Sequence, residues 1–195
     1  TMLKGAMAEI TLADPCLLAT DVGPVIDNEA KATLSAHFRK MQQQGQLIYQ
    51  VKTNAAHDKG CFFAPCAFEI SSISCLEQEF FGPFLHVIRY QADELDNVLA
   101  EINHTGFGLT LGVHSRIEAT IEKIISQAKV GNIYINRAMT GAVVGVQPFG
   151  GEGLSGTGPK AGGPHYLTRL CNERTLSVNT TASGGNASLM SLNDD

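Results

Sequence analysis

Tryptophan is absent from this chain of 195 residues, and there are only four tyrosines. Charged residues are also few, at 17% of the chain, and acidic residues outnumber basic ones by 19 to 14, which gives a net charge of −5. The lysines and arginines are scattered, whereas a nucleic-acid-binding surface would need a basic stripe. We therefore expect no nucleic acid contacts in this segment.

Long apolar runs are missing as well. No run approaches the roughly 20 residues of a membrane-spanning helix, and residues 1–10 lack the charged start and apolar centre of a signal peptide. Hydrophobic residues still make up 44% of the chain, which is ordinary for a globular domain with a packed core.

Cysteine is present in an odd number and without a close C-x-x-C pair. The five cysteines are Cys16, Cys61, Cys66, Cys75 and Cys171. This pattern favours free thiols in a reducing compartment. A zinc site made of His57 and the three middle cysteines is a remote alternative, because the spacings match no common zinc motif. We expect no metal site.

Glycine and proline concentrate in one stretch, QPFGGEGLSGTGPKAGGP at 147–164. This composition excludes the interior of a helix or strand and predicts a loop. A loop of this length in a compact domain commonly shapes a binding site. Residues 151–156 match the dinucleotide fingerprint G-x-G-x-x-G, but that fingerprint needs a helix that begins within it. The glycines and prolines that follow prevent such a helix, so we reject a phosphate site here.

Apolar periodicity predicts alternating helices and strands before this loop. One helix is expected over 28–44, capped by Asp27 and ended by Gly45. Further helices are expected over 2–10, 92–103, 117–129 and 166–171. Strands are expected over 47–51, 61–70, 84–90, 109–114, 132–136 and 175–179.

Two details of these strands matter later. Leu47, Tyr49 and Val51 are expected on one face of the first strand. Pro65 would place the second strand at a sheet edge or a bulge, because proline cannot donate to a ladder. Strands that alternate with helices through short connections predict an α/β fold with a parallel sheet covered by helices.

The segment EQEFFGP at 77–83 carries a possible binding pair. Glu79 and Phe81 are two residues apart, so an extended backbone would point them the same way. The carboxylate could accept hydrogen bonds from ribose hydroxyls while the ring packs against a flat ring. From these residues alone, a surface glutamate beside a core phenylalanine is the favoured alternative.

Four motifs together resemble a known family. In chain order they are EFFGP at 79–83, NHTGFGL at 103–109, GNIYIN at 131–136 and PFGGEGLSG at 148–156. This series looks like the late motifs of the aldehyde dehydrogenase superfamily. Residues 140–167 are similar to the 1-pyrroline-5-carboxylate dehydrogenases, which oxidise glutamate γ-semialdehyde. The ending, 173–192, resembles the C-terminus of the bifunctional proline utilization A proteins.

The resemblance implies roles for individual residues. Glu79 would hold the hydroxyls of the nicotinamide ribose of NAD, and Phe81 would pack against the nicotinamide. The backbone amides of Gly141 and Ala142 would hold the α-carboxylate of glutamate γ-semialdehyde, since small residues let N–H groups converge on an anion. Phe149 would pack against the aliphatic carbons of this substrate.

The resemblance also implies an organisation. Residues 1–170 would be part of a parallel-sheet catalytic domain of aldehyde dehydrogenase type, truncated at its N-terminal side. Residues 171–180 would form an oligomerisation strand, with 173–180 pairing in a homo-oligomer, and 181–195 a C-terminal tail motif. The nucleophilic cysteine is expected upstream of Thr1, in the remainder of the parent polypeptide. No catalytic residue is therefore assigned here, and we expect the chain alone to be inactive.

The parent implied by this resemblance is a cytoplasmic bacterial enzyme of proline catabolism that could associate peripherally with the inner membrane. FAD would belong only to its proline dehydrogenase domain, which is absent from this chain. Two other classes of function stay open. The chain could be an oligomerisation or interaction module that pairs through 175–179, or a small-anion or amino-acid-binding domain that uses the glycine-rich loop.

Overall fold

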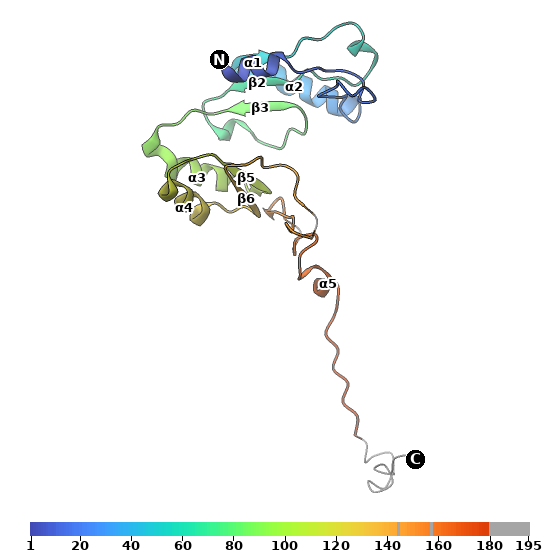
Figure 1. Ribbon diagram of the computed structural model, residues 1–195, viewed down its shortest axis with the longest axis vertical. Coiled ribbons are helices and arrows are strands. Elements are labelled where there is room, and N and C mark those ends of the chain that lie inside the picture. The colour runs from blue at the N-terminus through green and yellow to red at the C-terminus, as the bar shows by residue number, and fades with distance from the viewer. Residues whose placement is uncertain (144, 157, 180–195) are drawn as a thin grey trace.

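The computed structural model describes residues 1–143, 145–156 and 158–179. Figure 1 shows two groups of helices and strands, one from each half of the chain, and an extended C-terminal segment that projects away from both. No helix among the described residues is long and apolar enough to cross a membrane.

The first group packs two helices against a three-stranded sheet. The helices are α1 (Met2–Ala8) and α2 (Asn28–Gln44), and the strands are β1 (Gln46–Gln50), β2 (Cys66–Glu69) and β3 (Phe84–Val87). The predicted capping of α2 is confirmed, because the Asp27 carboxylate accepts a hydrogen bond from the Ala30 amide at 2.8 Å and Gly45 follows the last helical residue.

Two predictions about these strands are wrong. The strand at 66–69 is shorter than predicted and lies in the centre of its sheet, antiparallel to β1 and parallel to β3. Pro65 lacks an N–H group, so the ladder begins only after it, while its carbonyl still accepts from Val51. The pairing of β1 shifts between Leu47 and Tyr49. This shift leaves Leu47 44% exposed although Val51 is buried.

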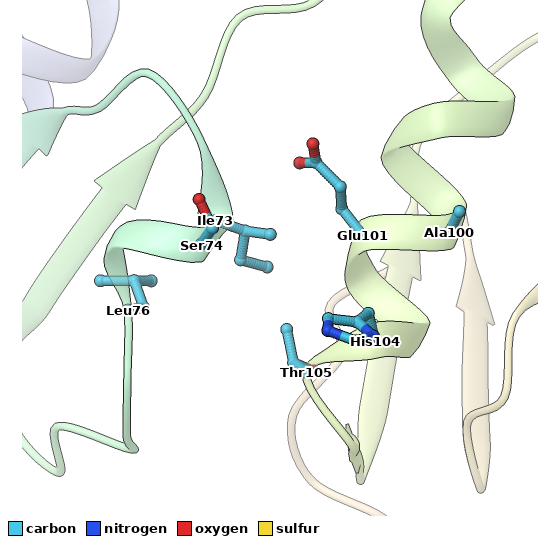
Figure 2. Close-up of a pocket in the computed structure, with 7 residues that line it drawn as sticks. All are labelled: Ile73, Ser74, Leu76, Ala100, Glu101, His104 and Thr105. Carbon is cyan, nitrogen blue, oxygen red and sulfur yellow. The ribbon is translucent and has the colours of Figure 1, made fainter.

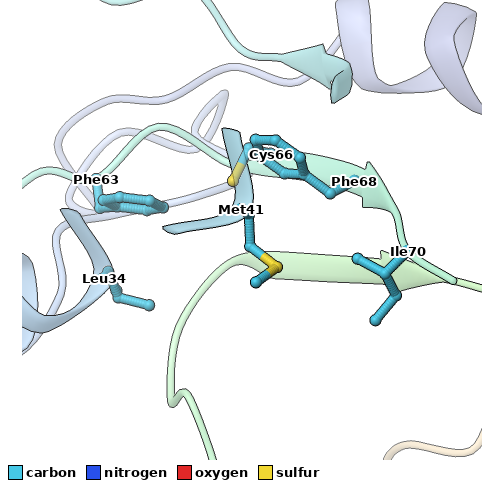
Figure 3. Packing of buried hydrophobic residues seen from close by; sticks show 6 residues of the cluster. All are labelled: Leu34, Met41, Phe63, Cys66, Phe68 and Ile70. Carbon is cyan, nitrogen blue, oxygen red and sulfur yellow. The ribbon is translucent and has the colours of Figure 1, made fainter. Parts of the chain in front are cut away.

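The core of this group lies between α2 and β2. Figure 3 shows six buried side chains, two from α2 and four from residues 63–70, namely Leu34, Met41, Phe63, Cys66, Phe68 and Ile70. Phe68 and Met41 have no exposed surface. This packing fixes α2 relative to the sheet.

The second group is a parallel strand pair with two helices. A 3₁₀ turn, η3 (Ala92–Glu94), leads into α3 (Leu95–His104), and β5 (Thr110–Val113), α4 (Glu118–Gln127) and β6 (Asn132–Ile135) follow. β5 and β6 pair in parallel from Thr110 opposite Asn132 to Val113 opposite Ile135. Leu99, Val113 and Ile124 form their buried core.

The predicted α/β class is confirmed by the two parallel pairs, β2–β3 and β5–β6. Within the described chain, however, no ladder joins β3 to β5, so the strands belong to separate sheets rather than to one. Two further 3₁₀ turns, η1 (His57–Lys59) and η2 (Ile73–Cys75), lie in the connections of the first group.

The glycine-rich stretch is a loop, as predicted, with one short pairing to β4 and one bridge within itself. β7 (Glu152–Gly153) pairs with β4 (Phe107–Gly108), and Phe149 bridges Ala161. A short helix, α5 (Tyr166–Arg169), follows where one was predicted.

The residues after α5 take an extended path. Residues 170–179 belong to no helix or strand and lie exposed, with Leu176 at 80% exposure. A strand needs a pairing partner, so the predicted strand at 175–179 is not formed within the described chain, and its pairing with another subunit stays a prediction. The predicted tail at 181–195 lies outside the described residues.

Candidate functional site

The segment Glu79–Phe81 alternates between exposed and half-buried side chains. Glu79 is exposed and Phe81 is 85% exposed, whereas Phe80 between them is half-buried in the first core. The Phe80 ring stacks on His37 of α2, with centroids 3.5 Å apart and planes at 16°. This packing holds the centre of the segment and leaves both predicted NAD-binding side chains free to contact a ligand.

Helix α2 supports this segment at a second point. A Cβ atom added at Gly82 would overlap Leu34 Cδ1, one helical turn before His37. A larger residue at this position would require the Leu34 side chain to shift, whereas glycine lets the turn lie directly against it. Burial, followed by the nearby His86 and Lys40, lowers the pKa of His37 to about 4. The ring that supports Phe80 is therefore neutral at physiological pH.

Glu79 lines a groove of about 390 Å³ between the two groups of elements. The side of the groove opposite Glu79 is formed by residues 107–111, together with Val130 and Ser155. The Ser155 hydroxyl accepts a hydrogen bond from the Gly108 amide at 3.1 Å. The glycine-rich loop thus helps to close the groove that contains the predicted cofactor residue.

A second cavity, of about 610 Å³, brings together the three predicted substrate residues. Gly141, Ala142 and Phe149 all line it, and Met139 adds a second large apolar side chain. Gly141 has φ of +75°, a conformation that favours glycine. Among the described residues, the amides of Gly141 and Ala142 have no hydrogen-bond acceptor, so both can donate to a bound anion.

The groove and the second cavity adjoin each other. Leu109 and Thr110 line both of them, at the start of β5. A ligand group bound beside Glu79 and a ligand bound between Gly141 and Phe149 would therefore meet across these two residues.

A third cavity, of about 620 Å³, was not predicted from the sequence. Figure 2 shows it between η2 and the C-terminal end of α3, with Ser74 on one side and Glu101 and His104 on the other. It shares Ile73, Leu76 and Thr105 with the groove that contains Glu79. No sequence motif predicts this cavity, because tertiary packing brings together two segments separated by more than twenty residues.

No cysteine lines any of these three cavities in the described chain. Cys66 is buried in the first core, and this burial raises the pKa of its thiol to about 12. The described residues also contain no cluster of three or more potential metal ligands. His57, from the alternative zinc set, instead contacts the Leu12 carbonyl at 2.7 Å through Nε2 and accepts from the Asn54 amide at 2.9 Å.

Comparison with known proteins gives consistent relatives. The chain is 53% identical over 179 residues to the bifunctional protein PutA of Klebsiella aerogenes. The matched region covers 89% of this chain and 14% of that protein. It is 38% identical over 171 residues to 1-pyrroline-5-carboxylate dehydrogenase of Geobacillus kaustophilus, covering 87% of this chain and 32% of that protein. The chain thus spans only part of the length of either relative.

Solved structures agree with these relatives. A mutant of proline utilization A from Bradyrhizobium japonicum superposes with a TM-score of 0.86 at 55% identity, over 93% of this chain and 18% of that one. A Thermus 1-pyrroline-5-carboxylate dehydrogenase with bound NAD superposes with a TM-score of 0.74 at 37% identity, over 84% of this chain and 31% of that one. The aldehyde dehydrogenase family profile matches residues 1–176. The chain belongs to the aldehyde dehydrogenase family.

Proposed function

We propose that this chain forms part of the active site of an NAD-dependent dehydrogenase that oxidises glutamate γ-semialdehyde to glutamate. The observation that carries the proposal is that the groove with Glu79 and the cavity with Phe149 share Leu109 and Thr110. Hydride transfer requires cofactor and aldehyde to be held side by side. The relatives named 1-pyrroline-5-carboxylate dehydrogenase support this choice of substrate.

The substrate cavity suits an amino acid with an aliphatic chain. Amides of Gly141 and Ala142 that lack acceptors among the described residues can bind the α-carboxylate, because converging backbone N–H groups form an anion site. Phe149 and Met139 supply apolar surface for the methylene carbons. The aldehyde end would then extend toward Leu109 and Thr110.

The residues of the groove fit the nicotinamide end of NAD. The exposed Glu79 carboxylate can accept hydrogen bonds from ribose hydroxyls, and the exposed Phe81 ring can pack against a flat ring. NAD, when bound, would accept the hydride that leaves the aldehyde carbon. The residues of this chain orient that exchange, with Phe80 held on His37 behind them.

Other parts of the reaction are proposed to come from outside this chain. The remainder of the parent polypeptide would supply the thiol that attacks the aldehyde, and FAD would bind only in its proline dehydrogenase domain.

We place the enzyme in the cytoplasm. The exposed residues 173–179, with Leu176 and Val178 largely uncovered, support a role of this end in pairing with a second subunit of a homo-oligomer.

The proposal can be tested in a full-length polypeptide in which this chain replaces the matching 179 residues of Klebsiella aerogenes PutA. The chimera should reduce NAD when supplied with glutamate γ-semialdehyde. Glu79→Gln should raise the KM for NAD alone. Ala142→Pro, which removes one amide donor, should raise the KM for the semialdehyde alone.

Three outcomes would contradict the proposal. A folded chimera without semialdehyde-dependent activity would exclude the substrate, and two substitutions that shift both KM values equally would exclude separate sites. Turnover by the 195-residue chain on its own would refute the need for an external thiol. Glutamate binding to the chain without activity in the chimera would favour the amino-acid-binding alternative.

Subunit pairing is tested separately by the mass of the chain in solution. Size-exclusion chromatography with light scattering should give a mass above one chain for residues 1–195, and the mass of one chain after removal of everything beyond Cys171. An unchanged oligomer after this removal would refute pairing through 173–180.

A further inference from the structure

We propose that Asn132 is a positioning residue that holds Phe149 in the substrate cavity by using its side-chain amide as a substitute strand partner. The link to substrate rests on the proposed function. The link to Phe149 rests on hydrogen bonds that the structure shows directly.

Asn132 does not line the cavity itself, but its hydrogen bonds reach residues on or beside two of the cavity's walls. It is the first residue of β6 and lies opposite Thr110 in the parallel pair. Its backbone amide donates to the Leu109 carbonyl at 3.1 Å. The main chain of Asn132 is therefore joined to Leu109 and Thr110, which line the cavity on one side.

The side chain of Asn132 is joined to the other wall. Its Nδ2 donates to the Pro148 carbonyl at 3.1 Å, and its Oδ1 accepts from the Gly150 amide at 3.2 Å. These two partners flank Phe149. A side-chain amide offers the same donor and acceptor as a peptide group, so Asn132 pairs with this segment as a neighbouring strand would.

The backbone of Phe149 itself is paired on the opposite side. Its amide donates to the Ala161 carbonyl at 3.0 Å, and its carbonyl accepts from the Ala161 amide at 2.9 Å. Successive residues of an extended segment point their polar groups to opposite sides. The segment around Phe149 is thus hydrogen-bonded to Asn132 on one side and to Ala161 on the other. The Phe149 ring extends away from both hydrogen-bonded sides and lines the cavity.

Two neighbours fix how closely the segment approaches. A Cβ atom added at Gly131 would overlap the Gly150 carbonyl oxygen, so the loop lies directly on the start of β6. The Lys160 ammonium group donates to the Gly131 carbonyl and lies 3.4 Å from Asn132 Oδ1. Gly131 therefore permits the short distance between the loop and β6, and Lys160 joins a later part of the loop to the same strand. The Asn132 side-chain amide then orients the residues on either side of Phe149.

A matched control lies just after the same strand. Asn136, just after β6, makes an equivalent pair of bonds, in which Nδ2 donates to the Ser115 carbonyl at 2.8 Å and Oδ1 accepts from the Ser115 amide at 3.0 Å. Neither Asn136 nor Ser115 is among the residues that line the cavity of Phe149. Its φ of +53° is suited to glycine. Asn136→Gly therefore removes two comparable hydrogen bonds away from the cavity.

The test compares Asn132→Leu with Asn136→Gly in the full-length chimera and in the 195-residue chain. Loss of the two bonds at Asn132 should raise the KM for glutamate γ-semialdehyde about tenfold and leave the KM for NAD unchanged. In the chain alone, the Gly150 amide should exchange its hydrogen about tenfold or more faster.

The possible outcomes separate the positioning role of Asn132, its hydrogen bonds to the loop and the proposed function. Faster exchange at Gly150 with an unchanged semialdehyde KM would overturn the positioning role while leaving the proposed function standing. An equal rise in this KM with Asn136→Gly would assign the effect to the stability of β6 and also overturn it. Unchanged hydrogen exchange at Gly150 in Asn132→Leu would refute the two hydrogen bonds of the Asn132 side chain, whatever the substrate of the enzyme. An unsubstituted chimera without activity would refute the proposed function, and with it the substrate role of Asn132.

Discussion

The imidazole rings of His37 and His86 meet with their Nε2 atoms 2.9 Å apart, so one nitrogen must donate a hydrogen and the other must accept it. Protonation of both rings would place two N–H groups against each other. His37 is only 2% exposed, and its Nδ1 has no hydrogen-bond partner among the described residues. A charge on His37 would therefore be poorly solvated, at the point where α2 supports Phe80.

The stability of the chain should consequently fall in mild acid. The pKa of His37 is lowered from 6.5 to about 4, so the unfolded chain binds more protons than the folded chain between these values. The stabilising contribution is complete above the higher value and is lost as pH falls through this range. Urea unfolding should show a loss of roughly 1 to 2 kcal/mol between about pH 7.5 and about pH 5.

Two variants separate this contribution from other groups. His37→Phe retains a ring that can stack on Phe80 but cannot titrate, so it should remove the part of the difference that arises from His37. The part that arises from His86, whose pKa is also lowered by burial, should remain. His114→Gln changes an exposed histidine and should leave the difference unchanged. A full acid dependence in His37→Phe would show that the loss of stability arises elsewhere.

Burial should separate a core phenylalanine from the phenylalanine that we propose packs against a ligand. Phe68→Ala empties the centre of the first core and should lower the free energy of unfolding by about 3 to 5 kcal/mol. Phe81→Ala, at an 85% exposed position, should change it by less than about 0.5 kcal/mol. Denaturant titration of the two variants checks this, and a large loss for Phe81→Ala would mean that its ring belongs to the core.

Added methyl groups at two glycines should have opposite effects. Gly131→Ala would force the glycine-rich loop away from β6, because its Cβ would overlap the Gly150 carbonyl oxygen, and we expect a loss of at least about 1 to 3 kcal/mol. Gly5→Ala lies within α1 with no atom within 4 Å of the new Cβ. It should stabilise the chain by about 0.5 to 1 kcal/mol. Melting temperatures that move in the same direction would contradict this.

The cysteines should differ strongly in reactivity. Cys16 and Cys171 are exposed, whereas Cys66 is buried with its thiol pKa raised to about 12. A maleimide at neutral pH should label the two exposed residues readily and Cys66 only after unfolding. Peptide mass mapping with and without urea measures this difference, and early labelling of Cys66 would show that the first core opens in the folded state.

Local sequence signals such as helix caps predicted the positions of the helices and strands well, but they predicted less well which strands pair. The cap at Asp27 and the stop at Gly45 act within a few residues, so sequence alone located α2. The missing N–H group of Pro65 predicts an edge or a bulge, because the rule for proline describes only its own hydrogen bonding. The structure instead begins the central strand immediately after it. The edge or centre of a sheet depends on strands that lie far away in the chain.

The candidate site shows the same limit. Motif resemblance gathered Gly141, Ala142 and Phe149, and the structure places all three around one cavity. The motif at 131–136 contains Asn132 but predicts no role for its side chain, because the partner Pro148 lies 16 residues later in the chain. The His37–His86 contact spans 49 residues and left no periodic or compositional trace.

The contact of α2 with the segment behind Glu79 has a consequence for protein design. Leu34 meets Gly82, and His37 meets Phe80, so the outward pose of Glu79 depends on one turn of a helix some forty residues earlier. Grafting the five-residue motif at 79–83 alone onto another scaffold would transfer its sequence but not its backbone geometry. The smallest transferable unit is the motif together with the helical turn beneath it.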